Sequence, residues 1–122
     1  MASAGKKKTV LVVDDEADVR AFVRTVLARH GYEVLEAEDG LAALEVVQQL
    51  SGKIELLVTD VKMPRMDGIT LGQKVSTGYP GIEVLYISAY VSESPTRGVG
   101  RHFLPKPFRP DALVSCVRNL SS

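Results

Sequence analysis

Two apolar runs in this 122-residue chain end in aspartates, and these carboxylates are the residues best suited to chemistry. The run TVLVV stops at Asp14 and Asp15, and the run IELLVT stops at Asp60. Solid apolar runs of this length are typical of strands with both faces covered, so each acid is expected at the edge of a crevice. A single aspartate before a loop more often only begins a turn, so Asp60 by itself is weak evidence of a site.

Three carboxylates that meet in one crevice need either protons or a cation. At an effective dielectric constant of about 20, two carboxylates about 4 Å apart repel each other by roughly 4 kcal/mol. Oxygen ligands in a small crevice that water can reach suit Mg²⁺, with Mn²⁺ as the alternative. Together, Asp14, Asp15 and Asp60 therefore predict a site for a hard divalent cation.

Ser88 and Lys106 follow two further predicted strands, at the same edge of the sheet as the acids. A lysine charge and a hydroxyl group beside one carboxylate can contact the oxygens of an acyl phosphate, with that carboxylate as the nucleophile. Each residue also has an ordinary explanation, Lys106 as a surface lysine and Ser88 as a hydroxyl that ends a strand. Their joint placement at one edge is what favours a common site.

Strand and helix patterns alternate along the chain. Short apolar or β-branched runs indicate strands, and apolar residues three or four apart indicate helices. Strands are expected at 9–13, 32–37, 54–60, 82–87 and 101–104. Helices are expected over 17–30, after the caps Asp39 and Asp67, and from Pro110 onward. The predicted buried stripes include Phe22 in the first helix and Leu50 in the second, and Gly31 is expected to end the first helix.

This alternation predicts an α/β fold, a doubly wound parallel sheet of five strands. The half-polar second strand and the short fifth strand suit the edges, which gives the order 2-1-3-4-5. In that order the topological switch point lies between the first and third strands, where ligands bind outside the carboxyl ends. Asp14, Asp15 and Asp60 are therefore expected to converge there.

Length and charge limit the remaining classes of function. A chain of 122 residues with 45% hydrophobic composition forms one domain, expected over 8–121 after a flexible leader at 1–7. Fifteen basic and fifteen acidic residues cancel, so direct binding to nucleic acid is not expected. No signal peptide or membrane segment is expected, and Cys116 has no partner for an internal disulfide. A cytoplasmic protein is the expectation, with a monomer favoured.

The motifs VLVVDDE, AEDG, LLVTDVKMPRMDG, VLYISAY and FLPKPF follow one another at nearly the spacing of a known family. Over about residues 8 to 121 the chain resembles the receiver domain of two-component response regulators. The resemblance implies that Asp60 is the phosphoacceptor and that Asp15 and Asp60 bind Mg²⁺ directly, with Asp14 acting largely through water. It also implies that the Lys62 backbone carbonyl completes the protein ligands.

The same resemblance implies roles for the residues near the fourth and fifth strands. Ser88 is expected to move toward the phosphoryl group, Lys106 to contact it, and Phe103 to be the aromatic switch. The peptide bond between Lys106 and Pro107 is expected to be cis. The expected partner is a sensor histidine kinase or a histidine phosphotransfer domain, and the chain catalyses only its own phosphorylation and dephosphorylation.

One segment departs from the family pattern. Only twelve residues separate Tyr90 from Phe103, and they are poor helix formers. A fourth helix that is short or replaced by a loop is therefore expected, as in receivers attached to hybrid sensor kinases. The resulting hypothesis is that phosphorylation chiefly reshapes the loop 91–100.

Three other classes of function compete with this interpretation. An aspartyl-nucleophile phosphatase needs an Asp-x-Asp pattern and a cap domain, whereas the acids here are adjacent and the chain is short. A flavin or nucleotide binder needs a phosphate loop after the first strand, where the sequence DDE would repel phosphate. A pseudo-receiver that acts only as an interaction module is disfavoured because no acid, hydroxyl or lysine of the motif is missing.

Overall fold

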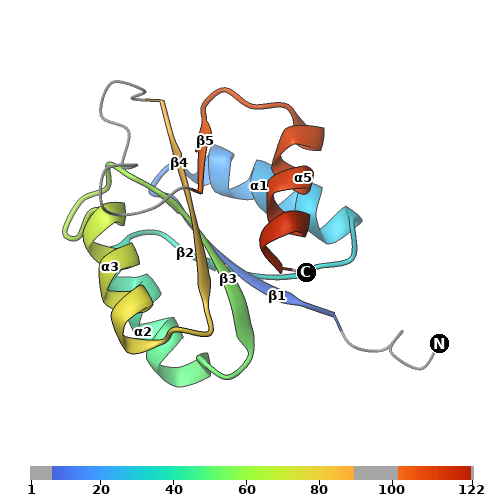
Figure 1. The fold of residues 1–122 in the computed structure, drawn as a ribbon. Helices are drawn as coiled ribbons and strands as arrows, with labels where there is room; N and C mark the ends of the chain where they lie inside the picture. Colours follow the sequence, from blue (N-terminus) through green and yellow to red (C-terminus); the bar gives the residue numbers. More distant parts are fainter. Residues whose placement is uncertain (1–6, 90–101, 122) are drawn as a thin grey trace.

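The computed structural model describes residues 7–89 and 102–121, and within them five parallel strands form one sheet (Figure 1). The strands are β1 Thr9–Val13, β2 Glu33–Ala37, β3 Ile54–Asp60, β4 Glu83–Ser88 and β5 Phe103–Pro105. Their order is β2-β1-β3-β4-β5, which confirms the predicted topology. The half-polar β2 and the short β5 form the edges, where a strand has one neighbour and need not be apolar on both faces.

Four helices in the described part of the chain cover both faces of the sheet. They are α1 Ala17–Arg29, α2 Gly40–Leu50, α3 Gly68–Gly78 and α5 Pro110–Ser121. Figure 1 shows α1 and α5 on one side of the sheet and α2 and α3 on the other, and each pair is in contact. Among these helices, none combines the length and the apolar character needed to cross a membrane.

Alternate residues of the central strands fill two separate hydrophobic cores. On β1, Val10 and Val12 belong to the core under α1 and α5, whereas Leu11 and Val13 belong to the core under α2 and α3. All four side chains are fully buried. The continuous apolar run therefore reflects a strand whose two faces are both covered, because successive side chains point to opposite faces.

The helix ends follow the predicted signals. The Asp39 carboxylate accepts a hydrogen bond from the Ala42 amide at 2.9 Å, and Asp67 accepts one from the Thr70 amide at 2.7 Å. Both aspartates therefore cap their helices as expected. Gly31 follows α1 with a φ of 92°, a left-handed conformation that glycine adopts without steric cost.

The glycines of α3 have a packing role. Gly72 is buried, and a Cβ atom at this position would overlap the hydroxyl group of Tyr86 on β4. The helix therefore lies close enough to the sheet for an aromatic side chain to take up the space beside its backbone. Its three glycines lower the helix propensity of the segment, so this helix is held chiefly by packing.

Three local predictions need correction. Phe22 on α1 is 42% exposed rather than buried. Its ring packs against Phe108 in the loop before α5, at the side of the sheet and not beneath it. Leu50 is 36% exposed because it is the last residue of α2, whereas the buried residues of this helix lie earlier, up to Val47. The fifth strand includes Pro105, which pairs with Ser88, and its predicted first residue, Arg101, lies outside the described residues. The predicted loss of the fourth helix and the loop 91–100 also lie outside the described residues.

Candidate functional site

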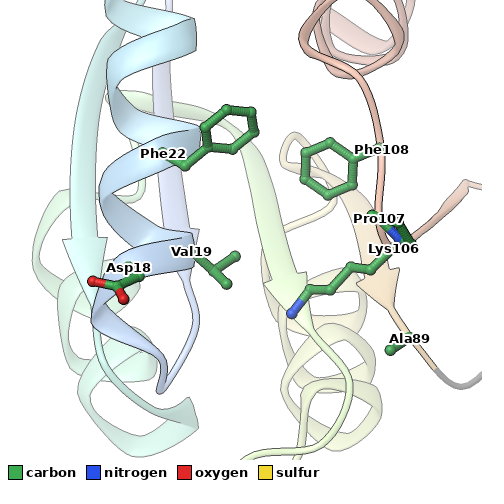
Figure 2. A pocket seen from close by; sticks show the side chains of 7 residues that line it. All are labelled: Asp18, Val19, Phe22, Ala89, Lys106, Pro107 and Phe108. Atoms are coloured by element: carbon green, nitrogen blue, oxygen red, sulfur yellow. The ribbon is translucent and has the colours of Figure 1, made fainter.

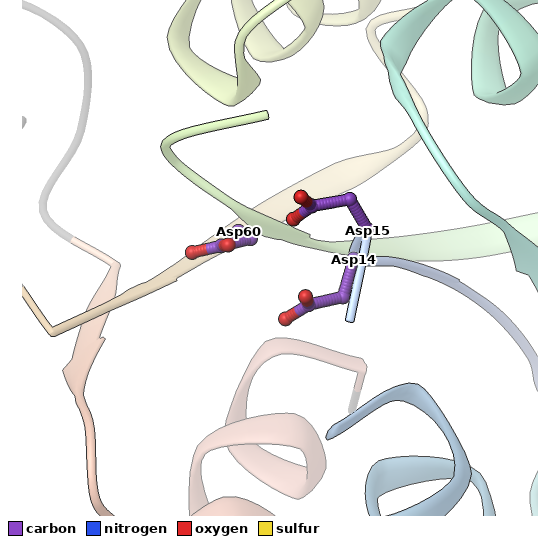
Figure 3. A group of neighbouring side chains, drawn as sticks. All are labelled: Asp14, Asp15 and Asp60. Carbon is purple, nitrogen blue, oxygen red and sulfur yellow. The ribbon is translucent and has the colours of Figure 1, made fainter. Parts of the chain in front are cut away.

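The carboxyl ends of β1 and β3 bring three aspartates together. Val13 pairs with Thr59 in the parallel register, so the residues that follow, Asp14 and Asp60, lie next to each other. One carboxylate oxygen from each of Asp14, Asp15 and Asp60 lies within 4.8 Å of the other two (Figure 3). The convergence expected from the strand order is therefore present.

Asp60 ends β3 with its side chain almost out of solvent. The residue is 8% exposed, and its Oδ1 accepts a hydrogen bond from the Val61 amide at 2.9 Å. Burial, together with the negative charge of Asp14, raises the pKa of Asp60 from 3.8 to about 6, against the opposing effect of the Lys106 charge. A carboxylate with a pKa near 6 is ionised at neutral pH and more basic than an ordinary surface aspartate, which suits a nucleophile.

Lys106 places its ammonium group among the acids. Its Nζ lies 3.1 Å from Asp14 Oδ2, 3.5 Å from Asp60 Oδ1 and 3.9 Å from Glu16 Oε1. Burial lowers the pKa of Lys106, but the hydrogen bond and charge of Asp14 and the charges of Asp60 and Glu16 outweigh it, so the net shift is upward. The lysine therefore stays charged at neutral pH. The peptide bond between Lys106 and Pro107 is cis, as predicted.

Asp14 is the most enclosed of the three acids. It has no exposed surface, and its Oδ1 accepts a hydrogen bond from the Glu16 amide at 2.9 Å. The Arg20 guanidinium donates to the Asp14 backbone carbonyl at 2.7 Å and to Glu36 on β2 at 3.2 Å. Arg20 thus ties the turn after β1 to the neighbouring edge strand, which limits the positions that the acids can take.

The acidic crevice is a pocket of about 310 Å³ lined by Asp15, Glu16, Asp60, Lys62, Ala89 and Lys106. Its carboxylate donors suit a hard divalent cation, since oxygen ligands and room for water are what Mg²⁺ requires. One lysine charge does not balance the three aspartates, which leaves net negative charge for a cation to offset. The residues present therefore fit a magnesium or manganese ion.

An apolar pocket of about 430 Å³ adjoins the acidic one. Figure 2 shows Phe22 and Val19 from α1 facing Pro107 and Phe108 across this pocket. The rings of Phe22 and Phe108 are tilted at 40° with their centroids 6.1 Å apart. Lys106 and Ala89 line both pockets, so the apolar surface leads directly into the acidic crevice.

The remaining predicted site residues lie around the crevice in different ways. Lys62 is exposed and lines it, in the loop after β3. Ser88 ends β4 and is 1% exposed, and its backbone carbonyl accepts a hydrogen bond from the Lys106 amide at 2.8 Å. Phe103 begins β5 opposite Tyr86 and packs half-buried against the core under α2 and α3. The roles predicted for these three residues remain predictions.

Sequence reasoning missed two residues that help to shape the crevice. Glu16 lines it and lies within ion-pair distance of Lys106. Its place directly after the two aspartates at the tip of the strand was an available signal, but only the aspartates were predicted as site residues. Arg20 gave no such signal, because its contact with the Asp14 carbonyl depends on how α1 turns back onto the sheet.

The model of the family described as "Response regulator receiver domain" matches residues 10–118 of the chain. The sensor kinase CckA of Brucella abortus (strain 2308) is 37% identical over 116 residues, which cover 92% of this chain and 12% of that protein. Sporulation initiation phosphotransferase F of Bacillus subtilis (strain 168) is 32% identical over 114 residues, covering 89% of this chain and 90% of that protein. The chain spans only part of several curated relatives, for example 49% of a transcriptional regulatory protein, YbdJ, of Bacillus subtilis.

Solved structures agree with these sequence matches. The receiver domain of the hybrid histidine kinase CckA superposes with a TM-score of 0.81 at 40% identity, covering 93% of this chain and 99% of that chain. The chemotaxis response regulator CheY4 of Vibrio cholerae superposes with a TM-score of 0.84 at 29% identity, covering 94% and 99% of the two chains. Both matches span nearly all of the fold described above.

Proposed function

Because the chain belongs to the receiver domains of response regulators, we propose that it accepts a phosphoryl group from a phosphohistidine onto Asp60. The observation that carries this proposal is the environment of Asp60. A nearly buried carboxylate with a pKa of about 6 lies 3.5 Å from the Lys106 ammonium, at the tip of β3 and beside two further acids. The family acts in two-component signal transduction, and the domain is proposed to modify only itself.

The transfer exchanges one bond to phosphorus for another. A carboxylate oxygen of Asp60 forms the new P–O bond while the P–N bond to the donor imidazole breaks, and the electron pair of that bond stays on the imidazole nitrogen. Lys106 is placed to donate hydrogen bonds to the phosphoryl oxygens, since its ammonium already lies within reach of Asp60. Asp60 is ionised above pH 6, so the nucleophile is available at neutral pH.

A divalent cation is proposed to be held by Asp14, Asp15, Asp60 and the backbone carbonyl of Lys62, with Asp14 acting largely through water. When bound, Mg²⁺ or Mn²⁺ supplies positive charge that lowers the repulsion between the carboxylates and an incoming phosphoryl group. The chain's own part is to keep the acids within 4.8 Å of one another, with Asp14 held by the hydrogen bond from the Glu16 amide.

Ser88 and Phe103 are proposed as the residues that respond to the new phosphoryl group. Ser88 lies at the end of β4, next to β3, and its backbone is bonded to Lys106. Phe103 on the edge strand β5 pairs with Tyr86 on β4, the strand that Ser88 ends. A movement at the end of β4 would therefore reach β5 through directly paired residues.

The phosphoryl donor is proposed to dock on the apolar pocket between Phe22 and Phe108. A donor protein must bring its phosphohistidine to Asp60, and this pocket shares Lys106 and Ala89 with the acidic crevice. The exposed Phe22 and the partly buried Phe108 beside the crevice offer the apolar contact area that a helical protein surface can cover. The partner is therefore proposed to be a sensor histidine kinase or a histidine phosphotransfer domain. The domain itself is proposed to act in the cytoplasm as a monomer, without direct binding to nucleic acid.

Intact-mass measurement after incubation with acetyl phosphate and Mg²⁺ tests the proposal. The wild type is expected to gain one phosphoryl group, and both Asp60→Asn and addition of a chelator are expected to abolish the gain. Asp67→Asn is the matched control, because Asp67 is an exposed aspartate that caps α3. A wild type that forms no adduct with any phosphoryl donor would contradict the proposal and leave an interaction module in its place.

A further inference from the structure

An ion pair joins the turn before α2 to the loop after β3. Both Nε and Nη2 of Arg65 donate to Asp39 Oδ2, the Nε bond being 2.9 Å long. The other oxygen of Asp39 caps α2 through the Ala42 amide. Asp39 is 4% exposed, whereas the Arg65 side chain is 56% exposed. Both oxygens of this buried carboxylate thus accept hydrogen bonds, one from the start of α2 and the other from Arg65 in the loop after β3.

The backbone of the loop is shaped to allow this pair. Arg65 has a φ of 69°, the only positive value at a non-glycine residue in the described part of the chain. That conformation is sterically unfavourable for arginine, so contacts elsewhere must hold it. Next to it, a Cβ atom on Gly40 would lie 2.5 Å from the Met66 carbonyl oxygen. The start of α2 and the loop after β3 therefore touch through backbone as well as through the ion pair.

The same loop carries residues of the acidic crevice. It leaves β3 at Asp60, passes Lys62 in the crevice wall, and closes where the Gly68 amide donates to the Val61 carbonyl at 2.8 Å. Between these points, the Arg65 guanidinium joins the loop to the start of α2 through Asp39. The ion pair therefore anchors the same loop that carries Lys62 in the crevice wall.

We propose that Asp39 and Arg65 are positioning residues for the phosphoacceptor site, which hold the loop 61–67 so that the Lys62 carbonyl faces the cation with Asp60. The proposal rests on the function proposed above and adds two residues outside the crevice to it. Asp39 acts through Arg65, and Arg65 acts through the loop backbone, so neither touches the phosphoryl group. Loss of such a supporting contact typically weakens metal affinity about 10- to 100-fold.

The test compares Arg65→Asn with the wild type. Asparagine enters the left-handed region more easily than most residues, so this variant removes the guanidinium with little extra backbone strain. Mg²⁺ affinity is measured by calorimetry, and amide hydrogen exchange is measured by NMR without metal. The expected results are an affinity about tenfold weaker and faster exchange at Gly68, while the amides of the central strand β3 keep their protection.

Two further variants separate positioning from general stability. Asp39→Asn keeps the cap of α2, because asparagine caps helices as well as aspartate does, but it removes the charge that faces Arg65. Arg65→Lys keeps the charge but cannot donate from both Nε and Nη2, so its Mg²⁺ affinity is expected to lie between those of Arg65→Asn and the wild type. Arg24→Gln is the matched control, since Arg24 is 50% exposed and paired with Glu36 at 2.8 Å, away from the loop.

The outcomes distinguish this inference from the proposed function. If the wild type binds Mg²⁺ and is phosphorylated while Arg65→Asn matches it in affinity and in Gly68 exchange, the positioning role is wrong and the function stands. If exchange rises equally at Gly68 and along β3, the pair serves only general stability and the inference is again wrong. A wild type that neither binds Mg²⁺ nor accepts phosphate would refute the proposed function itself.

Discussion

Replacing Asp60 by asparagine is expected to stabilise the metal-free protein at neutral pH. The pKa of Asp60 rises from 3.8 to about 6 in the folded chain, and one pKa unit corresponds to about 1.4 kcal/mol. Ionised Asp60 therefore costs the folded state about 3 kcal/mol. Asparagine has nearly the same shape, can still accept from the Val61 amide and carries no charge to repel Asp14. The raised pKa already includes the opposing attraction of Lys106, so about 3 kcal/mol is the net cost of the charge.

The gain from this substitution must depend on pH in a defined direction. The folded protein holds the Asp60 proton more tightly than the unfolded chain does, since the folded pKa is the higher one. Below pH 3.8 both states are protonated and the wild type bears no penalty. Between pH 3.8 and about 6 the unfolded chain releases the proton first, so wild-type stability falls as pH rises. Above that window the penalty is complete and constant.

Urea unfolding followed by circular dichroism at pH 4, 5, 6 and 7.5, with a chelator present, measures the effect. The free energy of unfolding of Asp60→Asn should exceed that of the wild type by up to about 3 kcal/mol at pH 7.5, and the difference should nearly vanish at pH 4. Asp67→Asn is the control for the loss of one carboxylate, because Asp67 is exposed. A difference that stays constant with pH, or a wild type more stable than Asp60→Asn at pH 7.5, would refute the reasoning.

Three other substitutions follow from the described contacts. Gly72→Ala is expected to lower the free energy of unfolding by about 1–3 kcal/mol because its Cβ would overlap the Tyr86 hydroxyl, and adding Tyr86→Phe should recover part of the loss in urea unfolding. Lys106→Ala leaves the fully buried Asp14 carboxylate without its cation and should cost about 3 kcal/mol in metal-free protein, whereas calorimetry should show Mg²⁺ affinity largely retained. A large loss of affinity would contradict that expectation. Phe22→Ala should change stability by less than about 1 kcal/mol yet slow transfer from a phosphohistidine protein about tenfold, with phosphorylation by acetyl phosphate unchanged. Equal rates with the protein donor would exclude the proposed docking surface.

The order of the elements and the meeting of the three aspartates follow from the sequence, because they depend on local and periodic signals. Apolar runs mark buried strands, the half-polar β2 and short β5 mark the edges, and parallel strands put their carboxyl ends at one side. The caps Asp39 and Asp67 are equally local, since each bonds an amide three residues further on. Where the periodic signal failed, the spacing was helical but the sheet does not cover the side chain: Phe22 packs against Phe108, and Leu50 is the last residue of α2.

Tertiary structure alone decided how these residues act on one another. The pKa of Asp60 depends on its burial and on its distances to Asp14 and Lys106, which come from three different strand ends. The ion pair between Asp39 and Arg65 joins residues 26 positions apart, and it requires a left-handed backbone at Arg65 that the sequence pattern does not predict. Coulomb and desolvation energies change steeply over a few ångströms, whereas sequence spacing specifies only which elements are neighbours. The sequence therefore determined which acids would share the crevice, and the packing of loops and helices determined their charge state and the contacts that hold them.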